Sequence, residues 1–207
     1  MTVVTAKRFS IAEYHRLGEL GFFAPDDRFE LIRGEIINMA AKGRLHSVCN
    51  SLLLEELVIL LARRARLRVQ EPIILSATDS EPEPDVVIAR NRSDNYLSSH
   101  PEPADILLVI EVSDSTLKYD RETKLSLYAE SGIANYWIFN LVDNQLEMHS
   151  EPYQKRQGDF NYRSQRVVLP NETIVIPGFP DLSLDLSLVF PRVRASQSRL
   201  TKGLRRI

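Results

Sequence analysis

Two carboxylates stand at the ends of apolar segments, where burying a charge is costly unless another group compensates it. Asp85 opens the apolar run DVVIA (85–89), and Glu111 lies near the end of the longer run DILLVIEVS (105–113). A buried carboxylate needs a cation, a proton or a metal ion beside it. If the two runs are antiparallel neighbours in a sheet, the start of one lies beside the end of the other and the carboxylates converge. Two carboxylates completed by water are a usual way to hold Mg²⁺.

A lysine follows the second run on a predicted helix, 120–131. Lys124 is four residues before Tyr128, so the two side chains face the same way. The aliphatic stem of Lys124 can lie on the apolar side of this helix and carry its ammonium group to the strand ends. Close to two carboxylates and a metal ion, that ammonium group can orient a water or neutralise charge on a phosphate.

Each of these three residues also has a plainer interpretation. Asp85 can be a turn acid at the start of a strand, and Glu111 can belong to a salt bridge or be exposed. Lys124 can be a surface lysine paired with Asp120. Only the combination of the three favours a site.

The bulk composition is that of one globular domain. The chain has 207 residues, of which 43% are hydrophobic and 26% charged, and this length allows a sizeable core. The single cysteine, Cys49, rules out an intramolecular disulfide and suits a reducing compartment. No segment approaches the roughly 18 apolar residues of a membrane span, and the N-terminus lacks the apolar core of a signal peptide. We therefore expect a cytoplasmic protein.

Charge is unevenly spread along the chain. The segment 191–207 holds six Lys and Arg residues and no acid, so residues 1–190 carry a net charge of −8 against −2 for the whole chain. We predict a single domain over 1–190 followed by a basic, disordered tail over 191–207. The tail is either a solvated terminus or a nucleic-acid arm. The acidic body argues against a non-specific DNA binder that relies on a basic surface.

Local patterns predict a mixed α/β domain. A capping box, Ser10 to Glu13, starts a helix, and Arg33-Gly34 is the turn of a hairpin. The predicted elements are a helix over 10–20, a hairpin over 28–40, a helix over 46–66, an edge or bulged strand over 67–75 that contains Pro72, strands over 85–89, 105–113 and 135–141, and an antiparallel meander from 143 to about 190 that completes the sheet. The helix between 105–113 and 135–141 allows these two strands to be parallel.

The site residues lie within a recognisable signature. Pro84-Asp85 followed by Glu111-Val112-Ser113 is similar to the PD-(D/E)XK nuclease signature, except that Ser113 stands where the lysine is usual. More narrowly, the chain resembles the Uma2 family of restriction-endonuclease-like proteins. The matching stretches are FELIRGEI (29–36), RLHS (44–47), PEPDVVIA (82–89), LVIEVSDST followed by Asp120 and Lys124 (108–124), and GIANYWIFN (132–140).

The resemblance implies a restriction-endonuclease-like αβ core and a Mg²⁺-dependent DNA endonuclease, with Mn²⁺ as a possible substitute. Hydrolysis would leave a 3′-hydroxyl and a 5′-phosphate. Asp85, Glu111 and the backbone carbonyl of Val112 would be the metal ligands. Lys124 would take the role of the catalytic lysine, since this lysine can migrate to the following helix.

Two upstream residues are second-rank candidates in the same resemblance. Glu30 would complete the metal site or hold a metal-bound water, and His46 would carry a proton or contact a phosphate. On the residues alone, Glu30 can equally decorate the hairpin, and His46, which lies on the apolar side of its predicted helix, can cap the buried end of that helix.

The flanking charges leave further alternatives open. Arg90 and Arg92 are either contacts to a nucleic-acid backbone or part of a solvated loop. Glu81 and Glu83 are expected to be solvated loop acids or, at most, outer groups of the site. A homodimer is expected, because nucleases that cut both strands often work as dimers. Ser113 favours the alternative that the chain is a nuclease fold without activity, serving as a binding or interaction module.

Overall fold

A computed structural model describes residues 5–192 of the chain. The predicted tail, 191–207, lies almost wholly outside the described residues. Helical segments are α1 (Ile11–Glu19), α2 (Arg44–Leu61), η1 (Ser76–Thr78), η2 (Pro103–Asp105), α3 (Leu117–Tyr119), the π-helical η3 (Asp120–Lys124), α4 (Leu125–Glu130) and η4 (Leu186–Leu188). Strands are β1 (Phe29–Ile32), β2 (Glu35–Asn38), β3 (Arg66–Val69), β4 (Val86–Ala89), β5 (Ile106–Ser113), β6 (Asn135–Asn140), β7 (Gln145–Gln154), β8 (Phe160–Val168), β9 (Thr173–Ile176) and β10 (Phe179–Asp185).

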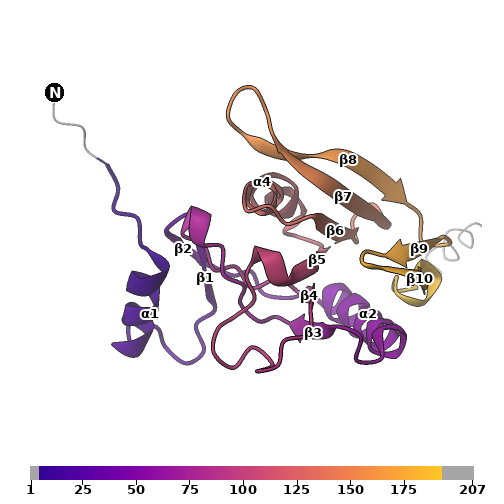
Figure 1. Cartoon of the computed structure of the whole chain (residues 1–207), viewed down its shortest axis with the longest axis horizontal. Helices are drawn as coiled ribbons and strands as arrows, with labels where there is room; N and C mark the ends of the chain where they lie inside the picture. The colour runs from indigo at the N-terminus through magenta and orange to yellow at the C-terminus, as the bar shows by residue number, and fades with distance from the viewer. Residues whose placement is uncertain (1–4, 193–207) are drawn as a thin grey trace, which may run out of the picture.

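A six-stranded mixed sheet forms the centre of the protein, in the order β3-β4-β5-β6-β7-β8 (Figure 1). β4 and β5 are antiparallel, and Val86 pairs with Ile110. β5 and β6 are parallel, as the intervening helix predicts. The continuous apolar run of β5 is explained by its place between two strands with both faces covered.

Each face of the sheet has its own helix. Alternate residues of β4 and β5, such as Val86 and Ile110, pack with Leu53 of α2 on one face, together with β9 and β10. The residues between them, such as Val109, point to the opposite face and pack with Tyr128 of α4. The period of two along a strand thus sorts the core into two layers, and it directs residue 111 toward the α4 side.

The β1–β2 hairpin forms a separate two-stranded sheet. Its turn has positive φ angles at Arg33 (51°) and Gly34 (74°), which is the conformation a two-residue hairpin turn requires. The backbone of Leu31 exchanges hydrogen bonds with that of Glu81. This contact ties the hairpin to the segment that leads into β4.

Three predicted elements differ from the observed ones. The strand predicted over 67–75 ends at Val69, because Gln70 takes a positive φ of 54° and Pro72 has no N–H to continue a ladder. Helix α2 covers residues 44–61, two residues earlier at its start than predicted and five shorter at its end. The meander prediction is correct for β7 and β8, which extend the sheet, while β9 and β10 pair only with each other.

The helix predicted over 120–131 contains a π-helical turn. Residues Asp120–Lys124 form this wider turn, and α4 follows without a break. π-helical turns occur mostly as short insertions and are frequent at functional sites. Within residues 5–192, no helix combines the length and the apolar character needed to cross a bilayer.

Candidate active site

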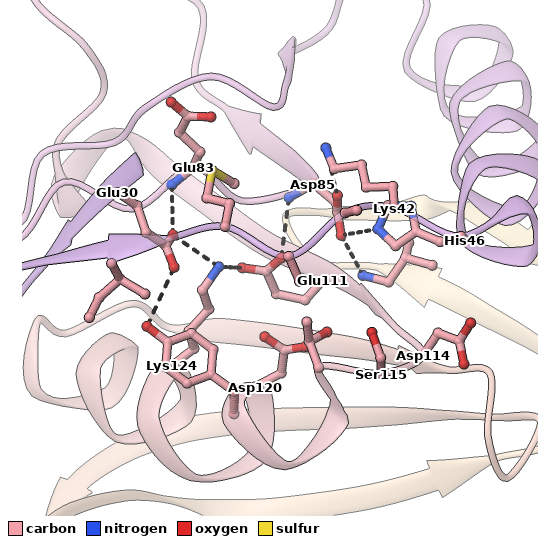
Figure 2. Close-up of a pocket in the computed structure, with 18 of the residues that line it drawn as sticks. Glu30, Lys42, His46, Glu83, Asp85, Glu111, Asp114, Ser115, Asp120 and Lys124 are labelled. Carbon is pink, nitrogen blue, oxygen red and sulfur yellow. Dashed lines mark hydrogen bonds and ion pairs between the residues drawn. The ribbon is translucent and has the colours of Figure 1, made fainter. Parts of the chain in front are cut away.

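Asp85 and Glu111 lie side by side where β4 begins and β5 ends (Figure 2). The pairing of Val86 with Ile110 places them at the next position of the antiparallel register. The Asp85 N–H donates to Glu111 Oε2 at 3.3 Å, and the Val112 N–H donates to Asp85 Oδ2 at 2.9 Å. Both side chains are buried, so the predicted convergence of these residues is observed.

Lys124 reaches the same point from the other side. Its ammonium group donates to Glu111 Oε1 at 3.0 Å and lies 3.2 Å from Glu30 Oε2. The three side chains are at most about 6% exposed. The Tyr128 hydroxyl, one turn further along, donates to the same Glu111 oxygen at 2.9 Å. The alternative ion pair of Lys124 with Asp120 is not the one formed. Glu30 is an ion-pair partner of Lys124 and not only a surface residue of the hairpin.

Burial and charge shift the pKa values of these groups in opposite directions. Burial raises the pKa of Glu111 to about 8, although Lys124 opposes the shift. Burial also acts to lower the pKa of Lys124, but Glu111 and Glu30 outweigh it and hold that pKa well above its usual value. The pKa of Asp85 is lowered, because the hydrogen bond from His46 and the Val112 N–H overcome the effect of burial.

His46 and Lys42 approach Asp85 from the start of α2. His46 Nε2 lies 2.9 Å from Asp85 Oδ2. Lys42 Nζ lies 3.7 Å from Asp85 Oδ1 and is buried without a hydrogen-bond partner among the residues that the structure describes. Burial lowers the pKa of Lys42, and Asp85 opposes this. His46 was a predicted candidate, whereas Lys42 was not.

Ser113, at the usual lysine position, belongs to a hydrogen-bonded cluster around Asp120. The Ser113 and Thr116 hydroxyls each donate to Asp120 Oδ2 at 2.7 Å. Asp120 is buried, and burial raises its pKa while Lys124 acts to lower it. The serine at this position therefore holds, through its hydroxyl group, the helical segment that carries Lys124.

An open cavity of about 230 Å³ lies over these residues. The donor set around it suits a hard divalent cation, which takes carboxylate and carbonyl oxygens and water. Of the oxygens of Asp85 and Glu111, Asp85 Oδ1 and Glu111 Oε2 are the least engaged, with a 3.7 Å ion pair and a 3.3 Å hydrogen bond. The Val112 N–H faces Asp85, and its carbonyl leaves β5 on the same side.

A metal site made of side chains alone is not formed. Across residues 5–192, no group of three or more His, Cys, Asp or Glu side chains has an arrangement that could hold a metal ion. A cation at Asp85 and Glu111 would therefore depend on the Val112 carbonyl and on water for its remaining ligands. That composition fits Mg²⁺, which keeps several waters in its coordination shell.

The remaining predicted charges lie outside this cluster. Arg90 is exposed and follows the far end of β4 from Asp85. Arg92 is held by Asp94 Oδ1 at 2.6 Å and stacks on the Tyr96 ring at 4.1 Å. Neither lies against the cavity.

The two acids before Asp85 differ from each other. Glu81 is buried and pairs with His15 Nε2 at 2.6 Å, so its prediction as a solvated loop acid is wrong. The hairpin covers it and leaves the imidazole as its partner. Glu83 lines the cavity, lies 3.5 Å from Arg28, and donates its backbone N–H to Glu30 Oε2.

Sequence reasoning missed Lys42, Asp120 and Tyr128 as members of this cluster. Asp120 and Tyr128 share the predicted helix with Lys124, at helical spacings of four residues, and that spacing was a usable signal. Lys42 carries a weaker one, since it stands four residues before His46 in a loop whose path the sequence does not set.

The fold and this acid–lysine cluster define a restriction-endonuclease-like α/β protein. The chain belongs to the Uma2 family, whose model carries the description "Putative restriction endonuclease" and matches residues 11–187. The fold is similar to the crystal structure of "a putative nuclease belonging to DUF820 from Anabaena variabilis ATCC 29413". The TM-score is 0.66 at 17% sequence identity, covering 88% of this chain and 97% of that one. The search of curated proteins gave no match.

Proposed function

We propose that the protein is a divalent-metal-dependent DNA endonuclease that hydrolyses phosphodiester bonds. The observation that carries this proposal is the contact of Lys124 with Glu111 beside Asp85, at the wall of an open cavity. A lysine and two carboxylates from separate elements converge there at a considerable cost in desolvation. Clusters of this kind concentrate at functional sites.

Asp85, Glu111 and the Val112 carbonyl would hold Mg²⁺ or Mn²⁺. When bound, such an ion polarises a phosphoryl oxygen and makes a water more acidic. Lys124 orients the attacking water or stabilises charge on the phosphate, and Glu30 holds its ammonium group in place. The water adds to phosphorus, the bond to the 3′ oxygen breaks, and the products are a 3′-hydroxyl and a 5′-phosphate.

The remaining parts of the proposal concern partners and place. The protein would act as a homodimer, since nucleases that cut both strands often work as dimers. Its single thiol, Cys49, is free and buried, and we place the protein in the reducing cytoplasm. The described residues around the cavity are acidic, so DNA would approach only together with a divalent cation.

Plasmid nicking with Mg²⁺ or Mn²⁺ tests the proposal. The Lys124→Met variant should lose at least about 100-fold in rate, the scale of one electrostatic group in a transition state. Lys118→Met is the matched control, because Lys118 lies on α3 with its side chain 86% exposed, and its rate should equal that of the wild type. Equal rates for both variants would remove Lys124 from the site.

A second candidate function is a nuclease-fold binding module without hydrolytic activity. The observation that favours it is Ser113, which occupies the usual lysine position and is fully engaged with Asp120. This candidate predicts no nicking with either metal on any DNA, together with binding of DNA or of another partner that survives the Lys124→Met change.

A further inference from the structure

Lys42 has a buried ammonium group that its surroundings leave unused. It lies 3.7 Å from Asp85 Oδ1, beyond hydrogen-bond reach, and has no other partner among residues 5–192. Lys124, the other lysine at the cavity, donates to Glu111 and pairs with Glu30. A buried donor without an acceptor is costly, which suggests that Lys42 meets its acceptor only when a ligand is bound.

His46 has an unused atom at the same wall of the cavity. The residue is 8% exposed, its Nε2 is engaged by Asp85, and its Nδ1 is buried with no partner in the described part of the chain. A ring whose Nε2 donates to a carboxylate has an Nδ1 that accepts when neutral and donates when protonated. Figure 2 places His46 and Lys42 on the same side of Asp85.

Both residues stand at the start of α2, an 18-residue helix. The N-cap is Gly43, with no side-chain cap, and the first turn contains no acid. The first N–H groups and the positive end of the helix dipole are therefore uncompensated by the helix itself. Gly43 lines the cavity together with Lys42 and His46, so this end of α2 lies at the cavity wall.

Apart from Lys124, the other charged residues that line the cavity are acids, and this limits what can bind. Asp114 faces Gly43, where a Cβ atom would lie 3.4 Å from its Oδ2, and Glu83 lines the cavity. An anion would therefore enter with a divalent cation to offset these carboxylates. Phosphate is the anion that suits a helix start, a lysine and a histidine together.

We propose that Lys42, His46 and the start of α2 form a phosphate subsite beside Asp85, which holds a phosphate group of the DNA strand. The inference rests on the proposed function, because it names where the backbone of that substrate binds. In the ligand-free protein Lys42 remains near Asp85. When phosphate is bound, its ammonium group donates to a phosphate oxygen instead.

The test follows the His46 ring signals in ¹H–¹³C NMR while inorganic phosphate is added in the presence of Mg²⁺. The His46→Gln variant assigns the signals. In the wild type they should shift and saturate, and in Lys42→Gln the apparent Kd should rise about tenfold, as for one charge-assisted hydrogen bond. Lys42→Arg should keep most of the affinity. Lys155→Gln is the matched control, since Lys155 is exposed in the turn between β7 and β8, and its Kd should stay within about twofold.

Nicking by the same preparations separates this inference from the proposed function. Phosphate binding that depends on Lys42 in a protein that nicks no DNA would support the subsite and overturn the nuclease. A wild type that nicks DNA while its His46 signals ignore phosphate would overturn the subsite. Equal Kd values for wild type and Lys42→Gln would overturn it as well.

Discussion

Lys124 is the charge on which the buried acids depend. Its ammonium group forms ion pairs with both Glu111 and Glu30, at N–O distances of 3.0 and 3.2 Å. Desolvation makes such a cluster a poor source of net stability, but removing one partner leaves the others unpaired. The cluster is therefore better explained by function than by stability, and removing one of its charges should destabilise the fold around the others without unfolding the protein.

Replacing Lys124 with methionine should lower the free energy of unfolding by about 3 kcal/mol, because two carboxylates would remain buried without a cation. Chemical denaturation at neutral pH measures this. Lys118→Met, at an exposed position, should change the free energy by less than about 0.5 kcal/mol. Adding Glu30→Gln to Lys124→Met should recover part of the loss, and a double variant no more stable than the single one would argue against a shared counter-ion.

At the scale of elements, the site depends on how β1, β4, β5 and the π-helical turn meet. The hairpin places Glu30 against Lys124. The turn of this hairpin has positive φ angles at Arg33 and Gly34. The ends of β4 and β5 place the two acids, and the turn from 120 to 124 directs the lysine inward. Changes in these elements should therefore alter the positions of the charged side chains at the site.

Gly34→Ala should destabilise the protein more than Gly21→Ala. Both glycines have φ near 70°, which costs a side chain about 1–2 kcal/mol. A Cβ at Gly34 would also lie 2.8 Å from Arg8 Cβ and 2.9 Å from the Phe9 oxygen, while nothing lies within 4 Å at Gly21. Urea denaturation compares the two variants. Equal losses of unfolding free energy would mean that the segment of Arg8 and Phe9 moves away from the new Cβ atom at no measurable cost.

His149 on β7 should make stability depend on pH. It is buried against the rings of Tyr136 and Tyr162, and burial lowers its pKa, with Glu147 opposing the shift. The unfolded chain then binds the proton more readily, so this contribution is complete above the ordinary histidine pKa of about 6.5 and is lost as pH falls. His149→Phe should reduce the loss of unfolding free energy between pH 7.5 and 5.5 by roughly 1 kcal/mol. An unchanged pH dependence would contradict this assignment.

At the scale of the whole molecule, the proposed function would require an acidic body to bind a polyanion. Residues 1–190 carry a net charge of −8, and several of these acids line the cavity. Affinity for DNA normally comes from basic groups that displace counter-ions. Here a bound divalent cation would have to supply much of that attraction.

Duplex DNA should therefore bind at least about tenfold more weakly in EDTA than with Ca²⁺, an ion that takes the same oxygen ligands as Mg²⁺. Fluorescence anisotropy with a labelled duplex measures both affinities at one salt concentration. Equal affinities in the two conditions would indicate a binding surface away from the acidic cavity.

The sequence predicted those parts of the fold and site that depend on local patterns. The apolar runs around Asp85 and Glu111 predicted the central strands and their acids, and the capping box predicted the start of α1, where both of its hydrogen bonds form. The end of β3, the separate β9–β10 sheet and the position of Lys42 depend on contacts between distant segments. These contacts leave no period or motif in the sequence.

Nicking of supercoiled plasmid by metal-free protein after addition of Mg²⁺, for the wild type and for Asp85→Asn, tests most directly whether the carboxylate of Asp85 is needed for metal-dependent cleavage. Asparagine keeps the size of Asp85 and removes the charge that would hold the ion. Asp159→Asn is the matched control, since Asp159 is exposed in the turn between β7 and β8. We expect Mg²⁺-dependent nicking by the wild type and the control, and none by Asp85→Asn. Nicking by Asp85→Asn at the wild-type rate would contradict the account.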